Sequence, residues 1–438
     1  MKAAIADRPE RLPMFGRAGD VSVPTIRSAK VRYAEMVRPN SLVRWAFYLS
    51  IFALPFYRLY IPGTGDRVGV TRFVQMLLAV GVASQPRVCL RFVPAALLWF
   101  LGYVALRLIS GFWFTPELRS LWWPSTFALI QFSLPWVWII FNLAYFPKLR
   151  RTGLWALVWG CSLCALLHVL GIGVNDVDNG AEGRSTIFLT NANSIGADYA
   201  VAMIIVIGLG LFRKSRPGRR ITSLALLALL GTGLAKTGSR SAALLVIMGT
   251  FILLFESEAL SSKSRRFLSL LLIIVVLAGV ISQVPTVLRR FEKVNSSNIR
   301  EQEGRVRMMP VLWEMFLRSP IYGSGPDQYQ VELTRRAMPY LIREHRTITS
   351  HNLVLLLLVE TGVIGFLVFA IGIGKTFMRA WIGRAHEGFL PLALLGPYII
   401  AAIIFANPMG HEVFWFVIAY GLAGTGSVLK KMENSFKQ

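Results

Sequence analysis

Residues 351–371 read His-Asn-Leu-Val-Leu-Leu-Leu-Leu-Val-Glu-Thr-Gly-Val-Ile-Gly-Phe-Leu-Val-Phe-Ala-Ile. A helix needs about 20 predominantly apolar residues to cross the hydrocarbon layer of a bilayer, and this segment is long enough. Similar apolar runs recur between residue 45 and the C-terminus. Of the 438 residues, 54% are hydrophobic and only 16% are charged, whereas a typical soluble protein carries about 25% charged residues. The sequence therefore predicts a polytopic membrane protein and excludes an ordinary soluble enzyme.

A scan for apolar segments of membrane-spanning length predicts about 12 transmembrane helices. The first nine fall within residues 41–284 and the last three within residues 351–429. The expected spans lie near 45–57, 68–84, 93–112, 121–146, 153–171, 194–212, 221–235, 240–255, 267–284, 351–371, 388–405 and 412–429. Residues 1–40 and 430–438 are expected to form polar tails, and residues 285–350 one large, partly helical loop. The predicted fold is therefore all-α.

The net charge of +24 arises from short basic clusters between the apolar runs. Lys and Arg gather in cytoplasmic loops for topological reasons, so this distribution does not require a nucleic-acid partner. With the N-terminus inside, the basic residues concentrate in the expected cytoplasmic segments and are sparse in the short outer loops. We therefore expect both termini in the cytoplasm and the loop 285–350 in the periplasm.

This outer loop contains the run Gly304–Arg318, in which Leu312, Met315 and Phe316 recur at helical spacing. Such a helix either lies in the membrane interface and caps a cavity or packs as an ordinary helix of an outer domain, and the sequence is compatible with both. The segment Ser319–Pro326 then predicts a tight turn, because it combines two proline and two glycine residues.

Three helices are expected to begin at the outer surface, namely spans six, eight and ten. Each start has a residue that can cap a helix: Asn193 or Ser194, Ser239, and Ser350. Helix N-termini offer free N–H groups and a partial positive charge, which suit a phosphate. The cations Arg184, Lys236 and Arg240 lie beside these starts. The pattern predicts an anion site at the outer surface, although the same cations could mark the interface or bind the headgroups of membrane lipids.

His351 opens the tenth span and adjoins this predicted anion site. A helix N-terminus disfavours the charged imidazolium, so His351 is a candidate for a neutral general base. A histidine at a helix start is also found as a cap or a packing residue, and the sequence leaves both interpretations open.

Other polar motifs are weaker candidates for chemistry. Asp176-Val-Asp178 spells a possible metal-binding pair, but it lies in an Asn/Gly-rich turn of the kind that is usually solvated. The sequence contains no recognised metal or nucleotide motif, so neither a metal nor a cofactor is expected. Asp198 and Glu360 lie within spans and are expected to pair with a nearby cation or hydroxyl. The pair Cys161 and Cys164 is expected to serve helix packing, because it falls inside an apolar helix.

Three segments together resemble the O-antigen ligase/O-antigen polymerase superfamily of bacterial membrane glycosyltransferases. They are Thr237–Leu245; Gly304-Arg305 followed by Trp313 and Pro320–Gly325; and Ser350–Asn352 followed by Glu360–Gly365. Arg184 before Asn191-Ala-Asn193 forms a fourth element, with Ala192 where the family pattern has proline. The order and spacing of these segments over residues 184–365 carry the resemblance.

The resemblance implies a GT-C-like glycosyltransferase of the Gram-negative inner membrane with a periplasmic active site. The donor would be a glycan on undecaprenyl pyrophosphate, and in the ligase branch the acceptor would be a sugar of the lipid A core. Metal and nucleotide sugar are not used in this family. Carried onto this sequence, the motifs imply a catalytic His351 and a pyrophosphate site of Arg184, Lys236, Arg240 and Arg305. The supporting residues would be Asn193, Ser239 and Asn352.

Three alternatives stay open at the level of sequence. An O-antigen polymerase uses the same donor with a second lipid-linked glycan as acceptor, but often has two substantial outer loops. A protein O-oligosaccharyltransferase would tend to carry a larger C-terminal outer region than residues 406–411. A transporter or flippase of an anionic lipid would show ionisable residues along a path through the membrane, or an inverted repeat.

Overall fold

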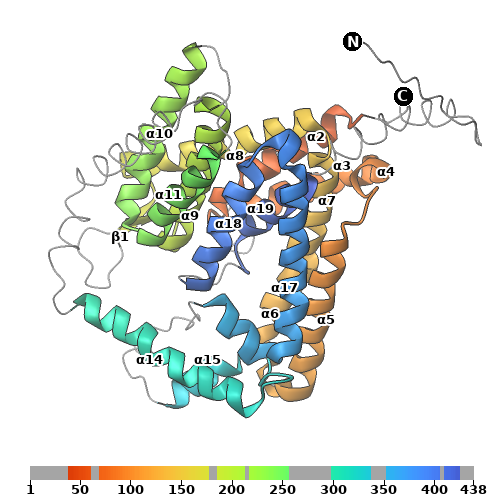
Figure 1. Ribbon diagram of the computed structural model, residues 1–438, viewed down its shortest axis with the longest axis vertical. Helices are drawn as coiled ribbons and strands as arrows, with labels where there is room; N and C mark the ends of the chain where they lie inside the picture. Colours follow the sequence, from red (N-terminus) through yellow and green to blue (C-terminus); the bar gives the residue numbers. More distant parts are fainter. Residues whose placement is uncertain are drawn as a thin grey trace, which may run out of the picture.

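The computed structural model describes residues 38–60, 69–176, 185–212, 217–255, 297–336, 352–404 and 409–424. Across these residues the chain is mostly helical, which confirms the all-α prediction in outline (Figure 1). The only strands in this part of the chain are β1 (Val174–Asp176) and β2 (Ser185–Ile187), which pair as an antiparallel hairpin. The α-helices are α2 (Ser41–Phe52), α3 (Val70–Ser84), α4 (Pro86–Cys89), α5 (Ala95–Phe114), α6 (Arg119–Ala128), α7 (Leu134–Ala144), α8 (Pro147–Leu170), α9 (Ala192–Val206), α10 (Pro217–Thr237), α11 (Arg240–Leu254), α14 (Ser297–Arg318), α15 (Gln328–Arg335), α17 (Leu353–Glu387), α18 (Leu390–Ile404) and α19 (Glu412–Ala423).

Several of these helices are long and apolar enough to cross a membrane. Among the described residues they are Ala95–Phe114, Pro116–Ala144, Pro147–Leu170, Ala192–Leu211 and Leu353–Arg384. Shorter apolar helices accompany them, including α2, α3, α11, α18 and α19. Every predicted span that falls within the described residues coincides with a helix. The ninth, near 267–284, lies outside those residues, so the total of about 12 spans stays a prediction.

Helix α17 departs from the simple span expected for residues 351–371, because it is longer and broken. At Gly362 the backbone has φ 65° and ψ −168°, a region that residues with a side chain rarely adopt. The segment before this glycine forms a short helix, and the segment after it forms a long apolar helix that packs along α5. The break in α17 therefore creates a corner at one end of the bundle (Figure 1).

Contacts at the two ends of the bundle show that the helices alternate in direction. At one end, Arg150 near the start of α8 forms an ion pair with Glu387 at the end of α17 and donates a hydrogen bond to the carbonyl of Ala423 at the end of α19. At the other end, the close of α8 meets the close of α10. The starts of α9, α11 and α17 therefore share one side of the bundle, as the predicted topology requires.

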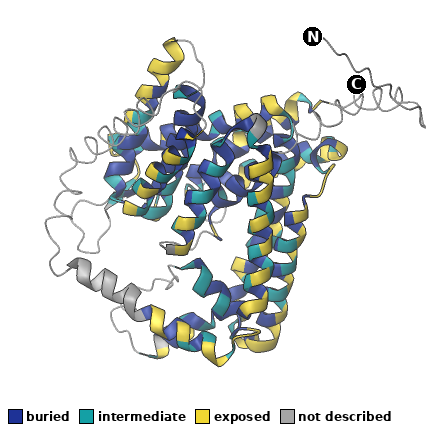
Figure 2. Cartoon of the chain, in the orientation of Figure 1, coloured by how far each residue is buried: buried dark blue, intermediate teal, exposed yellow. Residues whose placement is uncertain are grey.

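Helix α9 lies at the centre of the bundle. Most residues of α9 are buried, whereas α5 and α17 expose large apolar side chains along their lengths (Figure 2). Cys161 and Cys164 of α8 pack against it, and the Cys164 sulfur accepts a hydrogen bond from the hydroxyl of Tyr199 at 3.6 Å. This confirms the packing role expected for the two cysteines. The start of this central helix is thus well placed to position a site.

Candidate active site

The first turns of α9 pack against the corner between α10 and α11. A Cβ atom placed on Gly196 would lie 2.9 Å from the Cβ of Ser239 and 3.1 Å from the hydroxyl of Thr237, so only glycine permits this approach. Gly238 forms the corner itself, with φ 59°. Two of the three predicted helix starts, those of α9 and α11, are therefore brought side by side.

The N-cap residues of α9 and α11 agree only partly with those predicted from the sequence. Ser239 is the N-cap of α11, as predicted, and its hydroxyl accepts from the amide of Ala242 at 3.4 Å. The prediction of Asn193 or Ser194 for α9 is wrong, because Asn191 caps that helix and accepts from the amide of Asn193 at 2.8 Å. Asparagine at either position suits a cap, so composition alone did not fix the boundary.

The cap predicted for the tenth span is wrong as well. Helix α17 begins at Leu353, and Asn352, not Ser350, is its N-cap. The side chain of Asn352 accepts a hydrogen bond from the amide of Leu355 at 2.9 Å. His351 therefore immediately precedes the cap of α17, but His351 itself lies outside the described residues.

Lys236 has a structural partner that the sequence did not reveal. Its ammonium donates hydrogen bonds to the carbonyls of His168 at 3.2 Å and Val169 at 3.0 Å, which are among the last carbonyls of α8. A lysine near a helix C-terminus favours these groups because they carry partial negative charge. An ammonium has three donors, and these bonds use two of them, so a third can reach an anion.

The β1–β2 hairpin places Ser185, the residue after Arg184, beside His168 and Lys236. Ser185, the first residue of β2, contacts the ring nitrogen Nε2 of His168 at 2.9 Å and donates to the carbonyl of Lys236 at 3.4 Å. Arg184 directly precedes Ser185 and lies outside the described residues. A place for Arg184 in the cluster of α8, α10 and the hairpin stays a prediction.

Arg240 is the first residue of α11, and its side chain is exposed at the corner between α10 and α11. Arg305 lies within α14, but its side chain is outside the described residues, as is His351. The structure thus joins the segments that carry Arg184, Lys236, Arg240, Asn193 and Ser239. The convergence of Arg305 and His351 on that group stays a prediction.

Two of the motifs that carry the resemblance interlock through their backbones. The amide of Ser324 donates to the carbonyl of Val359 at 2.7 Å, and the amide of Val363 donates to the carbonyl of Pro320 at 2.8 Å. A Cβ on Gly323 would lie 2.5 Å from the carbonyl carbon of Glu360. The turn at residues 320–325 therefore satisfies backbone groups that the break at Gly362 frees.

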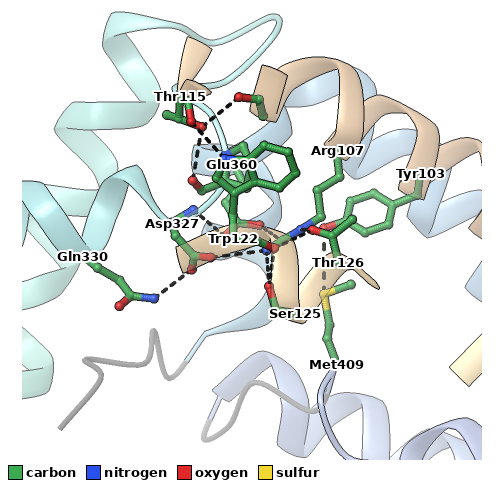
Figure 3. Close-up of polar contacts among 12 residues, drawn as sticks. Tyr103, Arg107, Thr115, Trp122, Ser125, Thr126, Asp327, Gln330, Glu360 and Met409 are labelled. Carbon is green, nitrogen blue, oxygen red and sulfur yellow. Dashed lines mark hydrogen bonds and ion pairs between the residues drawn. The ribbon is translucent and has the colours of Figure 1, made fainter. Parts of the chain in front are cut away.

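A buried ion pair lies beneath this contact. Arg107 of α5 forms an ion pair with Glu360 of α17 (Figure 3). This confirms that Glu360 pairs with a nearby cation. Nη2 of Arg107 also lies 3.7 Å from Oδ2 of Asp327. The guanidinium also donates to the hydroxyl of Thr126 at 2.9 Å. The amide of Asp327 donates to Glu360 at 3.2 Å. The sequence showed a cation and a carboxylate in separate spans, but gave no sign that they face each other.

A second buried group links α9 to α19. Asp198 is fully buried, and its Oδ1 lies 3.4 Å from Nε2 of His411, the N-cap residue of α19. The hydroxyl of Tyr398 lies 2.7 Å from the other ring nitrogen of His411. Asp198 thus lies beside an imidazole from another helix, and this contact links the start of α19 to α9. Whether the imidazole is the cation expected for Asp198 stays a prediction.

A network of charged side chains joins α14 to α15. Arg336 donates hydrogen bonds to Glu314 at 2.6 Å and to Glu332 at 2.8 Å. Hydrogen bonds from Arg336 and Arg318 hold the pKa of Glu314 at about 2, and those from Arg335 and Arg336 do the same for Glu332. Both carboxylates are therefore ionised at neutral pH, and α14 and α15 form one layer at the end of the bundle.

Comparison with protein-family models agrees with the resemblance. A comparison with curated protein sequences gives no significant match. A family model described as O-antigen ligase matches residues 225–370, which contain the α10–α11 corner, α14, α15 and the first part of α17. Members of this family are glycosyltransferase-like enzymes, both ligases and polymerases. This match over residues 225–370 supports membership of the O-antigen ligase/polymerase family.

Proposed function

We propose that this protein is an O-antigen ligase, which transfers a glycan from undecaprenyl pyrophosphate to a sugar hydroxyl of the lipid A core. The observation that carries the proposal is the packing of Gly196 against Thr237 and Ser239, because it joins two helix N-termini. Lys236 and Arg240 flank the same corner. Free N–H groups, helix dipoles and cations in one place are suited to a pyrophosphate.

The chemistry follows from the charges. The acceptor hydroxyl oxygen attacks the anomeric carbon, the bond from that carbon to the pyrophosphate oxygen breaks, and undecaprenyl pyrophosphate leaves. Negative charge grows on the pyrophosphate oxygens, and the fixed cations Lys236 and Arg240, joined by Arg184 and Arg305, stabilise it. His351 takes the proton of the attacking hydroxyl as general base. A direct displacement of this kind inverts the configuration at the anomeric carbon.

The proposed setting is the inner membrane of a Gram-negative bacterium, with the site on the periplasmic side and both termini in the cytoplasm. The polar groups of the described corner gather at one end of the helices, at the close of α8 and α10 and the starts of α9 and α11. A path for transport would instead need ionisable groups through the whole membrane. The one-sided arrangement therefore favours an enzyme over a transporter or flippase.

Deletion of the gene tests the proposal in cells. A ligase predicts a lipid A core without glycan, together with polymer that accumulates on undecaprenyl pyrophosphate. A polymerase predicts core that carries single repeat units and no long chains, and that result would contradict the ligase assignment. Unchanged surface polysaccharide and unchanged lipid-linked intermediates would contradict both. Complementation with the wild-type gene is the control.

A further inference from the structure

Helix α14 is apolar on two faces. One face packs toward α17, where Met308, Leu312 and Met315 are buried. The other face exposes large apolar side chains spaced four residues apart, and the following turn continues them. This surface, here named the α14 stripe, consists of Met309, Trp313, Leu317, Ile321 and Tyr322, which are 44%, 49%, 59%, 55% and 61% exposed. No other described element covers it, and water is a poor solvent for such a surface.

The depth of α14 and α15 in the membrane follows from the contacts that the residues between them make with α5. Helix α5 has 20 residues and is therefore about 30 Å long, close to the thickness of the hydrocarbon layer. Asp327 contacts Arg107, which lies roughly 10 Å along the helix from its outer end at Phe114. The hydroxyl of Thr115 donates to the carbonyl of Pro326 at 3.5 Å. The junction between α14 and α15 therefore lies beside the last turns of a membrane helix, not above them.

Aromatic residues mark the same level on the neighbouring helix. Trp113, at the end of α5, is 79% exposed, and Arg119 stacks its guanidinium on the ring of Trp123 at 5.3 Å. Tryptophan and tyrosine with adjacent arginines are typical of the membrane–water interface. Trp313 and Tyr322 of the α14 stripe extend this belt around the bundle, and α14 runs crosswise to α5 and α17 (Figure 1).

We propose that α14 is an interfacial helix, whose stripe contacts the acyl chains and glycerol region of outer-leaflet phospholipid. Arg318 and Arg335, at the polar edge of the layer, keep their charges in the headgroup region, where they pair with Glu314 and Glu332. This inference resolves the two alternatives that the sequence left for the loop. It also holds Arg305 and the turn at residues 320–325 at the membrane surface, where a lipid-linked substrate carries its charged group.

Depth-dependent quenching tests this inference. Trp313→Cys and Leu317→Cys report on the stripe, and Arg335→Cys reports on the polar edge as the matched control. The three native cysteines are buried, so an environment-sensitive fluorophore attaches selectively to the introduced thiol. The replaced side chains are exposed, so the packing of α14 on α17 is retained. The full-length protein is placed in nanodiscs that hold one copy and contain phosphatidylcholine brominated on its acyl chains.

We expect brominated lipid to quench the fluorophores at 313 and 317 at least twofold more than the one at 335, and aqueous iodide to show the opposite order. Equal and strong iodide quenching at all three positions would overturn the proposal, because α14 would then face water. Protection of 313 and 317 from both quenchers would overturn it as well, because protein and not lipid would cover the stripe. The test does not depend on the reaction that the protein catalyses.

Discussion

Arg107 and Glu360 expose only 7% and 1% of their side chains, so their charges depend on each other. Glu360→Ala leaves the guanidinium buried without its main counter-ion, and loss of one partner of a buried pair costs about 3–5 kcal/mol. Asp327 remains 3.7 Å from the guanidinium of Arg107, but it cannot replace the contacts that Glu360 makes. We expect a clearly lower midpoint of thermal unfolding for the purified variant.

The control for this prediction removes all three charges of the cluster. In the triple variant Arg107→Met, Asp327→Asn and Glu360→Met, no charge stays buried alone, so most of the lost stability should return. A Glu360→Ala protein that unfolds at the wild-type temperature would show that the pair does not stabilise the bundle.

His351 is the residue on which the proposed chemistry depends most. Loss of a general base lowers turnover about 10²–10⁴-fold, so His351→Ala should show that loss at saturating donor while it still binds donor lipid. Turnover and donor affinity measured on the same purified variant separate this role from phosphate binding. Normal turnover with weakened donor binding would assign His351 to the pyrophosphate instead.

At the scale of single residues, some features could be predicted from the sequence and others could not. The outer cations and Ser239 could be found because polar residues at the start of an apolar helix are uncommon and have a known capping role. The bonds from Lys236 to the last carbonyls of α8 could not be found, because they join residues 67 and 68 positions apart. The same holds for Arg107 and Glu360, which are 253 positions apart.

At the scale of elements, the break in α17 is the feature that joins the motifs. A Cβ on Gly362 would collide with the carbonyl of Ile321, and its φ of 65° is strained for any other residue. Gly362→Ala should therefore destabilise the protein by about 1–3 kcal/mol and release the turn at residues 320–325. Thermal unfolding and limited proteolysis within that turn measure the two effects.

Gly374→Ala is the matched control on the same helix. A Cβ at Gly374 meets no atom within 4 Å, and alanine favours a helix over glycine by about 1 kcal/mol. This variant should be as stable as the wild type or slightly more stable. Equal behaviour of the two alanine variants would contradict the role assigned to the break at Gly362.

Length and apolar composition predicted the positions of the helices well, because a membrane span must satisfy its backbone internally and needs a defined length. The break in α17 was not predicted, since Gly362 lies in an apolar run where glycine is also common in straight membrane helices. The contact between residues 320–325 and the break consists of backbone hydrogen bonds, which leave little trace in side-chain patterns. The motifs could therefore be recognised in the sequence, but the contact between them could not be predicted.

At the scale of the whole molecule, the charge distribution predicts which end of the bundle faces the periplasm. The structure puts α15 at one end and the start of α8 at the other. A cysteine at Arg335 should react with a membrane-impermeant thiol reagent in intact cells after the outer membrane is permeabilised. A cysteine at Lys148 should react only after lysis. The reverse pattern would invert the topology and move the proposed site to the cytoplasmic side.

Glycan transfer by the purified protein tests the central claim most directly. In proteoliposomes with undecaprenyl-pyrophosphate-linked glycan and lipid A core, the wild type should form glycan-substituted lipid A core and release undecaprenyl pyrophosphate. Arg240→Ala should lose most of this activity and Arg240→Lys should regain little, because a lysine cannot bind phosphate through two parallel hydrogen bonds. Arg119→Ala, which removes an exposed cation that stacks on Trp123, should remain active. Longer glycan on undecaprenyl pyrophosphate with no substituted core, or full transfer by Arg240→Ala, would contradict the account.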